Sequence, residues 1–140
     1  IITTADADIL NQFGALVTNG QEELASLAYL ITMEFVAQNG AEVEAMGNKI
    51  EAELAKVGAE FPEILDGLEG QGHLSSINFK DINKAAELTK VMNGKCSDIS
   101  AQLYKADCPP AVLLKLPLIT TDAVLDFFTK KLREGLNEVK

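Results

Sequence analysis

The stretch that decides the expected fold is residues 21–38, which read QEELASLAYLITMEFVAQ. Apolar side chains fall on nearly every side of a helix formed by these residues. Such a helix normally lies at the centre of a bundle, because each of its sides needs cover from water. Asn-Gly dipeptides at residues 19–20 and 39–40 bound the stretch and tolerate the left-handed backbone of helix ends. We therefore expect a central apolar helix near residues 21–38.

The flanking segments repeat apolar residues at intervals of three and four, which is the spacing of one helix face. None of their apolar runs alternates with polar residues over the length of a strand. The sequence thus predicts an all-α fold, one domain over residues 1–140, formed by a compact bundle of five to seven helices. The segments expected around the central helix are a first helix ending at Asn19-Gly20, a third over residues 41–60, a short fourth after Pro62, a fifth from residue 78 or 79 to about 105, a short apolar piece at 111–116, and a last helix capped by Thr120 or Thr121.

Charge and hydropathy exclude several classes of partner. The formal net charge is −9, and residues 1–79 carry 2 bases and 13 acids while residues 80–140 carry 10 bases and 8 acids. An acidic chain without a basic stripe is repelled by nucleic acid and by anionic membranes. The unequal halves indicate either a solvated acidic face or a polarity for docking between molecules. No transmembrane segment is expected, because Glu34 interrupts the longest apolar run, residues 24–37.

The first residues and the two cysteines bear on the compartment. The chain begins Ile1-Ile2-Thr3-Thr4, without Met, so either a signal segment has been removed or the sequence is a fragment. Cys96 and Cys108 are close enough across a helix end for one intrachain disulfide, which would stabilise by about 3 kcal/mol. The alternative is two reduced thiols in a cytosolic protein. We expect a secreted protein with this bridge.

Residues for catalysis or metal binding are scarce. His73 is the only histidine and lies in the loosest segment, the glycine-rich residues 69–76. It is the sole imidazole base available to a Ser or Cys nucleophile, and no second group completes a recognisable triad. The sequence therefore predicts a solvated loop histidine, no catalytic residue, no metal site, no cofactor, and a protein that is not an enzyme.

Two features point to a hydrophobic ligand. Glu34 sits in the most apolar helix, either on a narrow solvent-facing strip with Gln38 or at the edge of an apolar cavity where it orients a ligand's polar head. Residues 112–119 are almost all apolar, and they form either a core plug or a flap over such a cavity. Tight packing around the central helix is the alternative to a cavity. The expected ligand-binding residues are Leu27, Leu30, Ile31, Glu34, Phe35, Leu113, Leu116 and Phe128.

These features lead to two hypotheses about function. The first is a secreted helical binding protein that encloses a hydrophobic small molecule such as a fatty acid. The second is a structural or interaction protein that buries the same apolar surface in a homo-oligomer. Co-purifying lipid would favour the first, and a concentration-dependent size without ligand would favour the second.

Overall fold

The computed structural model describes residues 22–95, 97, 99–101 and 108–140, and the chain divides into two units, residues 1–39 and 40–140. Helix α1, Glu23–Glu60, contributes to both units. Its helical geometry is interrupted at Asn39 (φ −122°, ψ 25°), where the side-chain amide donates a hydrogen bond to the carbonyl of Phe35. The break falls at the Asn-Gly dipeptide that the sequence predicts as a helix end.

The described part of the first unit is the helix of residues 23–39. Its large apolar side chains are exposed, with Leu24 at 70% and Leu30 at 63% of full accessibility. The extent of this helix matches the prediction, but its predicted place at the centre of a bundle is wrong. None of the buried hydrophobic residues that form the core belongs to it.

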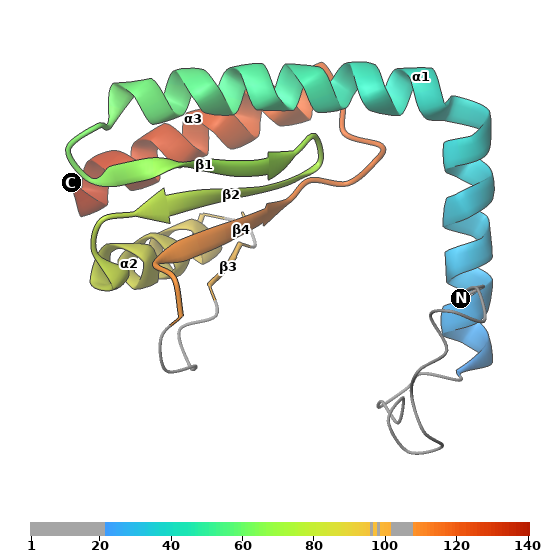
Figure 1. The fold of residues 1–140 in the computed structure, drawn as a ribbon, viewed down its shortest axis with the longest axis horizontal. Coiled ribbons are helices and arrows are strands. Elements are labelled where there is room, and N and C mark those ends of the chain that lie inside the picture. The colour runs from blue at the N-terminus through green and yellow to red at the C-terminus, as the bar shows by residue number, and fades with distance from the viewer. Residues whose placement is uncertain (1–21, 96, 98, 102–107) are drawn as a thin grey trace, which may run out of the picture. The chain divides into compact units, whose positions relative to one another are not determined.

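Residues 40–140 form a mixed helix and sheet unit, so the predicted all-α bundle of five to seven helices is wrong. Four antiparallel strands in the order β1-β2-β4-β3 make one sheet, accompanied by three helices (Figure 1). The elements are the second part of α1, ending at Glu60; β1, Leu65–Gln71; β2, Leu74–Phe79; α2, Ile82–Asn93; β3, Ser100–Ala101; β4, Ala111–Lys115; and α3, Asp122–Val139.

One face of the sheet packs against the helices of this unit. Leu68, Ile77 and Val112 are register partners on β1, β2 and β4, and they belong to the core cluster or pack against it. Glu69, Ser76 and Leu113 are partners one residue along and lie on the opposite face, because side chains alternate along a strand.

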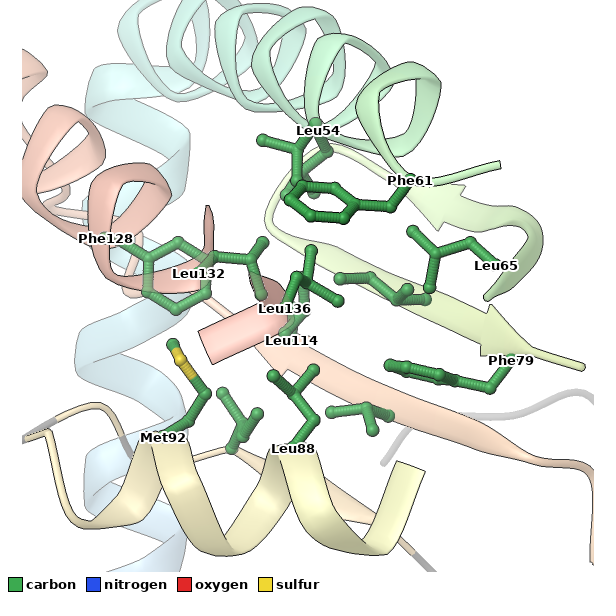
Figure 2. Close-up of a cluster of buried hydrophobic side chains, with 14 of the residues drawn as sticks. Leu54, Phe61, Leu65, Phe79, Leu88, Met92, Leu114, Phe128, Leu132 and Leu136 are labelled. Carbon is green, nitrogen blue, oxygen red and sulfur yellow. The ribbon is translucent and has the colours of Figure 1, made fainter. Parts of the chain in front are cut away.

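The core lies between the sheet and the three helices (Figure 2). Full burial of a leucine or phenylalanine side chain contributes about 1.5–3 kcal/mol, so this cluster is the main source of stability of the unit. The side chains labelled in Figure 2 are Leu54 from α1, Phe61 and Leu65 beside β1, Phe79 from β2, Leu88 and Met92 from α2, Leu114 from β4, and Phe128, Leu132 and Leu136 from α3.

Helix α2 corrects the predicted fifth helix at both ends. The expected start at residue 78 or 79 belongs to β2, and the helix begins after Asp81, whose carboxylate accepts a hydrogen bond from the backbone N–H of Asn83. This is the usual chemistry of a helix N-cap. The helix ends at Asn93, and the backbone N–H of Gly94 donates to the carbonyl of Lys90.

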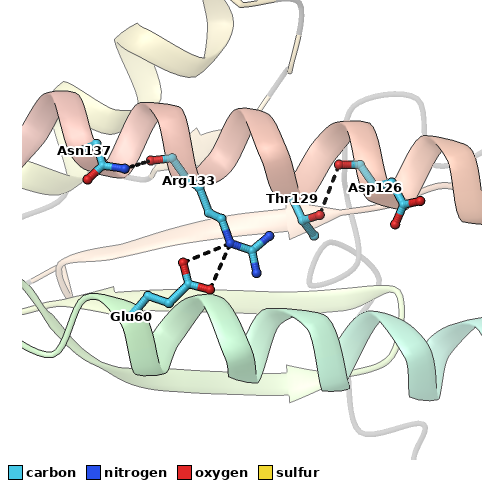
Figure 3. A network of polar contacts seen from close by, with 5 residues as sticks. All are labelled: Glu60, Asp126, Thr129, Arg133 and Asn137. Carbon is cyan, nitrogen blue, oxygen red and sulfur yellow. Dashed lines mark hydrogen bonds and ion pairs between the residues drawn. The ribbon is translucent and has the colours of Figure 1, made fainter.

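Helices α1 and α3 are joined by ion pairs. Glu60 at the end of α1 accepts hydrogen bonds from Arg133 Nε on α3 at 2.9 and 3.0 Å, and the neighbouring Asn137 amide donates to the Arg133 carbonyl (Figure 3). Lys49 Nζ and Asp122 Oδ1 form a second pair at 2.8 Å. No helix in the described part of the chain combines the length and hydropathy needed to cross a membrane.

Candidate functional site

An apolar pocket of about 450 Å³ lies where β4 runs into the first turns of α3. Leu116 and Phe128, two of the ligand-binding residues expected from the sequence, are brought together in its wall. The remaining lining residues are Ser97, Ile99, Leu114, Lys115, Pro117, Val124 and Phe127.

Local hydrogen bonds fix the connection that forms one wall of this pocket. The backbone N–H and the hydroxyl of Thr120 both donate to the carbonyl of Pro117, which closes a tight turn. The Thr121 hydroxyl then accepts from the backbone N–H of Val124 and caps α3. On the other side, the backbone N–H of Leu116 donates to the carbonyl of His73 in the β1–β2 turn.

The other predicted binding residues do not join this pocket. Leu113 lies on the opposite face of β4, because a strand turns every second side chain away and Leu114 takes the inward position. Glu34 accepts a hydrogen bond from the Gln38 amide at 2.6 Å and is exposed, as the alternative of a solvent-facing strip requires. The remaining predicted binding residues belong to the first unit, and their part in a ligand site stays a prediction. They are Leu27, Leu30, Ile31, Glu34 and Phe35.

Ser97 and Ile99 are missing from the predicted set because the sequence pattern predicts a continuous helix through residues 96–105. Ile99, Val124 and Phe127 line the pocket together with Leu114 and Pro117. The alternation of inward Val112 and Leu114 along β4 was the available signal. It was hidden because residues 112–114 are all apolar, and a short apolar run does not separate a strand from a helix.

The pocket contains few groups that could perform chemistry. Ser97 is buried and Lys115 is exposed, and none of the lining residues that the structure describes is an acid or a histidine. Among the residues that the structure describes, no three His, Cys, Asp or Glu side chains are grouped to hold a metal ion. The arrangement can bind or pack against apolar groups, but it holds no pair of acid and base for proton transfer.

A second, more open pocket of about 540 Å³ lies between the end of α1 and β1. Its wall carries Asp66 and Lys80 among small side chains such as Ala55 and Gly58. Lys80 Nζ already donates to the carbonyl of Pro62 at 2.7 Å, so its ammonium group is engaged within the fold. This pocket is a concave surface, and the ammonium group in its wall is already hydrogen-bonded within the fold.

Shifted pKa values lie away from both pockets, on exposed ion pairs. A hydrogen bond from Lys131 lowers the pKa of Glu134, and one from Lys140 lowers the pKa of Glu63. A hydrogen bond to Glu138 raises the pKa of Lys95. Each shift favours the charged form of a surface pair, which is a structural role.

The expected disulfide receives no support. Cys108 is half-buried and is a free cysteine, while Cys96 lies outside the described residues.

Comparison with known proteins gives the class of this fold. No family model matches the sequence, and no curated protein matches it. Among solved structures, a lysine aminotransferase from M. tuberculosis superposes with a TM-score of 0.66 at 19% identity, over 78% of this chain and 24% of that one. An aminotransferase from Bacillus anthracis gives 0.64 at 18% identity, over 78% and 27%. Acetylornithine aminotransferase from Elizabethkingia anophelis gives 0.59 at 20%, over 69% and 23%.

These likenesses show that the chain shares a fold with part of the aminotransferases, and it spans about a quarter of their length. They contradict the expected helical protein that encloses a fatty acid or another hydrophobic molecule, and the expected homo-oligomeric assembly protein. Secretion is not tested by these likenesses and stays a prediction. The expectation of a non-enzyme is contradicted by the same finding. Several apolar residues that suggested a ligand cavity, Phe128 among them, are used instead to pack the sheet against the helices.

Proposed function

We propose that residues 40–140 act as one domain of an aminotransferase-type enzyme whose other parts lie outside these 140 residues. The observation that carries this proposal is the superposition with the lysine aminotransferase, which covers 78% of this chain but only 24% of that enzyme. A domain of this size contributes a packed scaffold and shaped surfaces, while the reacting groups come from the longer polypeptide.

The described residues do not fit the cofactor that such an enzyme implies. Aminotransferases carry out their chemistry on pyridoxal phosphate, whose phosphate group is commonly held at a helix N-terminus. Here α2 is capped by Asp81, and α3 has Asp122 in its first turn. A carboxylate at these positions occupies the N–H groups or repels a second anion. We derive no catalytic step through the cofactor from these residues.

The lysines of the domain lead to the same conclusion. A lysine that reacts with a carbonyl group is usually desolvated in an enclosed site. Among the residues that the structure describes, the lysines that line these two pockets are Lys80 and Lys115, and both are exposed. The described residues of the domain therefore offer no enclosed lysine in either pocket, and the part proposed for the domain is to support and cover a site built by other segments.

The test is an assay of the native polypeptide that contains this sequence, captured with an antibody raised against residues 40–140. We expect a chain about three times as long as this one, with amino-group transfer from lysine or acetylornithine to a 2-oxo acid. The 140-residue chain is the control and should show neither transfer nor the visible absorbance of bound pyridoxal phosphate. A native polypeptide too short to complete the fold, without amino-group transfer, would overturn the proposal.

A further inference from the structure

His73 joins three segments of the domain that are far apart in the sequence. Its half-buried side chain lies in the two-residue turn between β1 and β2. The ring nitrogen Nδ1 is 3.2 Å from the carbonyl oxygen of Leu116, in the β4–α3 connection. The other nitrogen, Nε2, is 3.2 Å from the carbonyl oxygen of Val43 on α1. The ring thus spans the space between two backbone acceptors, and the prediction of a solvated loop histidine is wrong.

Glycines allow the β1–β2 turn that carries His73 to approach the helix closely. A Cβ at Gly47 would lie 3.7 Å from His73 Cδ2 and 3.2 Å from the Cα of Gly72. Gly72 itself has a φ of +56°, which side chains other than glycine rarely adopt. The Gly72 backbone N–H donates to the Glu51 carboxylate at 2.6 Å and holds the turn against α1. The position of the ring is therefore fixed by packing and by backbone geometry.

The two carbonyl partners select one protonation state. A backbone carbonyl can only accept a hydrogen bond, and a neutral imidazole carries one N–H and one unprotonated nitrogen. In either neutral tautomer, one carbonyl oxygen would face the lone pair of a ring nitrogen. The imidazolium form has two N–H groups and donates to both carbonyls. We propose that His73 is a protonation-dependent clamp, in which the imidazolium form ties the β1–β2 turn to both α1 and the β4–α3 connection.

Charged residues occur on each of the elements that the ring joins. Glu42 and Glu44 are the sequence neighbours of Val43, and Glu51 accepts a hydrogen bond from the N–H of Gly72, the residue before His73. Lys49, also on α1, is paired with Asp122 of α3, and residues 116–121 carry no charge. The other charged residues close to these positions in the sequence are Glu69 on β1 and Lys115 on β4.

Loss of the proton would act on the pocket between β4 and α3. Leu116 forms part of its wall, and His73 holds Leu116 through both its backbone carbonyl and its ring. When the ring is neutral, at least one of its two side-chain contacts is lost, while the backbone bond from Leu116 N–H remains. The clamp therefore makes the rigidity of the connection or of the α1 contact depend on pH.

Nuclear magnetic resonance of the full chain tests the protonation state directly. His73 is the only histidine, so labelling histidine with ¹⁵N gives signals from one ring and needs no assignment. We expect both ring nitrogens to carry protons at about pH 6, with both N–H signals protected from exchange with water. A ring with a single N–H at that pH would overturn the proposal.

A stability comparison tests the linkage. Imidazoles ordinarily change charge between about pH 5 and 8, and a stabilising contact of the protonated form is present in acid and lost as the pH rises. The wild type should therefore lose about tenfold in its folding equilibrium constant, relative to His73→Gln, between about pH 5 and about pH 8. Glutamine offers an amide donor without a titration. Parallel pH profiles for the two proteins would contradict the clamp, and if the variant does not fold, the resonance experiment decides.

Discussion

Gly70 shows how strongly one backbone position constrains the β1–β2 hairpin. Its φ is +100°, and a Cβ built there would lie 2.4 Å from the Leu74 carbonyl oxygen and 2.7 Å from the Cα of Ser75. Both contacts are with backbone, which cannot move away without disturbing the ladder between β1 and β2. We expect Gly70→Ala to lower the free energy of unfolding by about 2–3 kcal/mol, measured by urea denaturation.

Gly67 provides the matched control on the same strand, because a Cβ there would meet no atom within 4 Å. Gly67→Ala should change the free energy of unfolding by less than about 0.5 kcal/mol. Equal effects of the two substitutions would mean that the strained geometry at Gly70 is not what fixes the turn.

Single carboxylates respond to acid in a direction that their pKa shifts determine. The hydrogen bond from Lys131 holds the pKa of Glu134 below its usual value of 4.5. A carboxylate whose pKa is lower in the folded protein than in the unfolded chain stabilises the fold at pH values above its unfolded-state pKa. This stabilisation is lost as the pH falls through the folded-state pKa. We expect wild-type stability to fall below about pH 4.5, with a smaller fall in Glu134→Gln, measured by denaturation at a series of pH values. Lys131→Met should match Glu134→Gln, and a steeper loss in either variant would contradict this assignment.

At the scale of the elements, the helix pattern was predictable and the strands were not. Repeats of three and four residues correctly predict helix over residues 41–60 and in the last segment, where the Thr121 cap is confirmed. The strands are short, and β2 buries the polar residues Ser75 and Ser76 while it exposes Leu74. A strand is recognised in a sequence by apolar residues that alternate with polar ones and face the core, and residues 74–76 do not follow this pattern. Leu113, a predicted ligand-binding residue, lies outside the pocket, because the inward side of a strand is set by its pairing.

The ion pairs between α1 and α3 specify the direction of packing. Lys49 pairs with Asp122 and Glu60 with Arg133, each 73 residues apart, so 11 residues separate the pairs on both helices. That distance is about three helical turns, which puts both pairs on one face. The two helices therefore run in the same direction, and an opposite direction would bring like charges together.

Substitutions at Glu60 and Arg133 test this arrangement. Arg133→Glu should lower the free energy of unfolding by about 0.5–1 kcal/mol, because it places two carboxylates together on a partly exposed surface. Adding Glu60→Arg restores opposite charges and should recover most of the loss. Thermal denaturation of the wild type, both single variants and the double variant gives the coupling energy, which should shrink at high salt. Additive effects of the two substitutions would show that the pair contributes nothing.

At the scale of the whole molecule, the many apolar residues of the chain lie in two different settings. The sequence predicts that they form a central helix and a ligand cavity. In the structure, the buried core is confined to residues 50–139, while the apolar helix of residues 23–39 is exposed. No periodicity in a single sequence distinguishes a helix buried in its own domain from one that is buried by other segments of a larger fold.

The last prediction concerns the independence of the second unit. Among the residues that the structure describes, every buried member of the core cluster lies within residues 40–140, so a protein truncated to these residues keeps all of that cluster. We expect it to unfold cooperatively in urea, with a free energy within about 0.5 kcal/mol of the corresponding transition in the full chain. The full chain keeps the exposed Leu24, Leu27, Leu30 and Ile31 and should bind more of a hydrophobic dye than the truncated protein. A truncated protein without a cooperative transition would show that residues 1–39 are required for the fold of the domain. Equal dye binding by the two proteins would show that the exposed helix of residues 23–39 is not the surface that binds the dye.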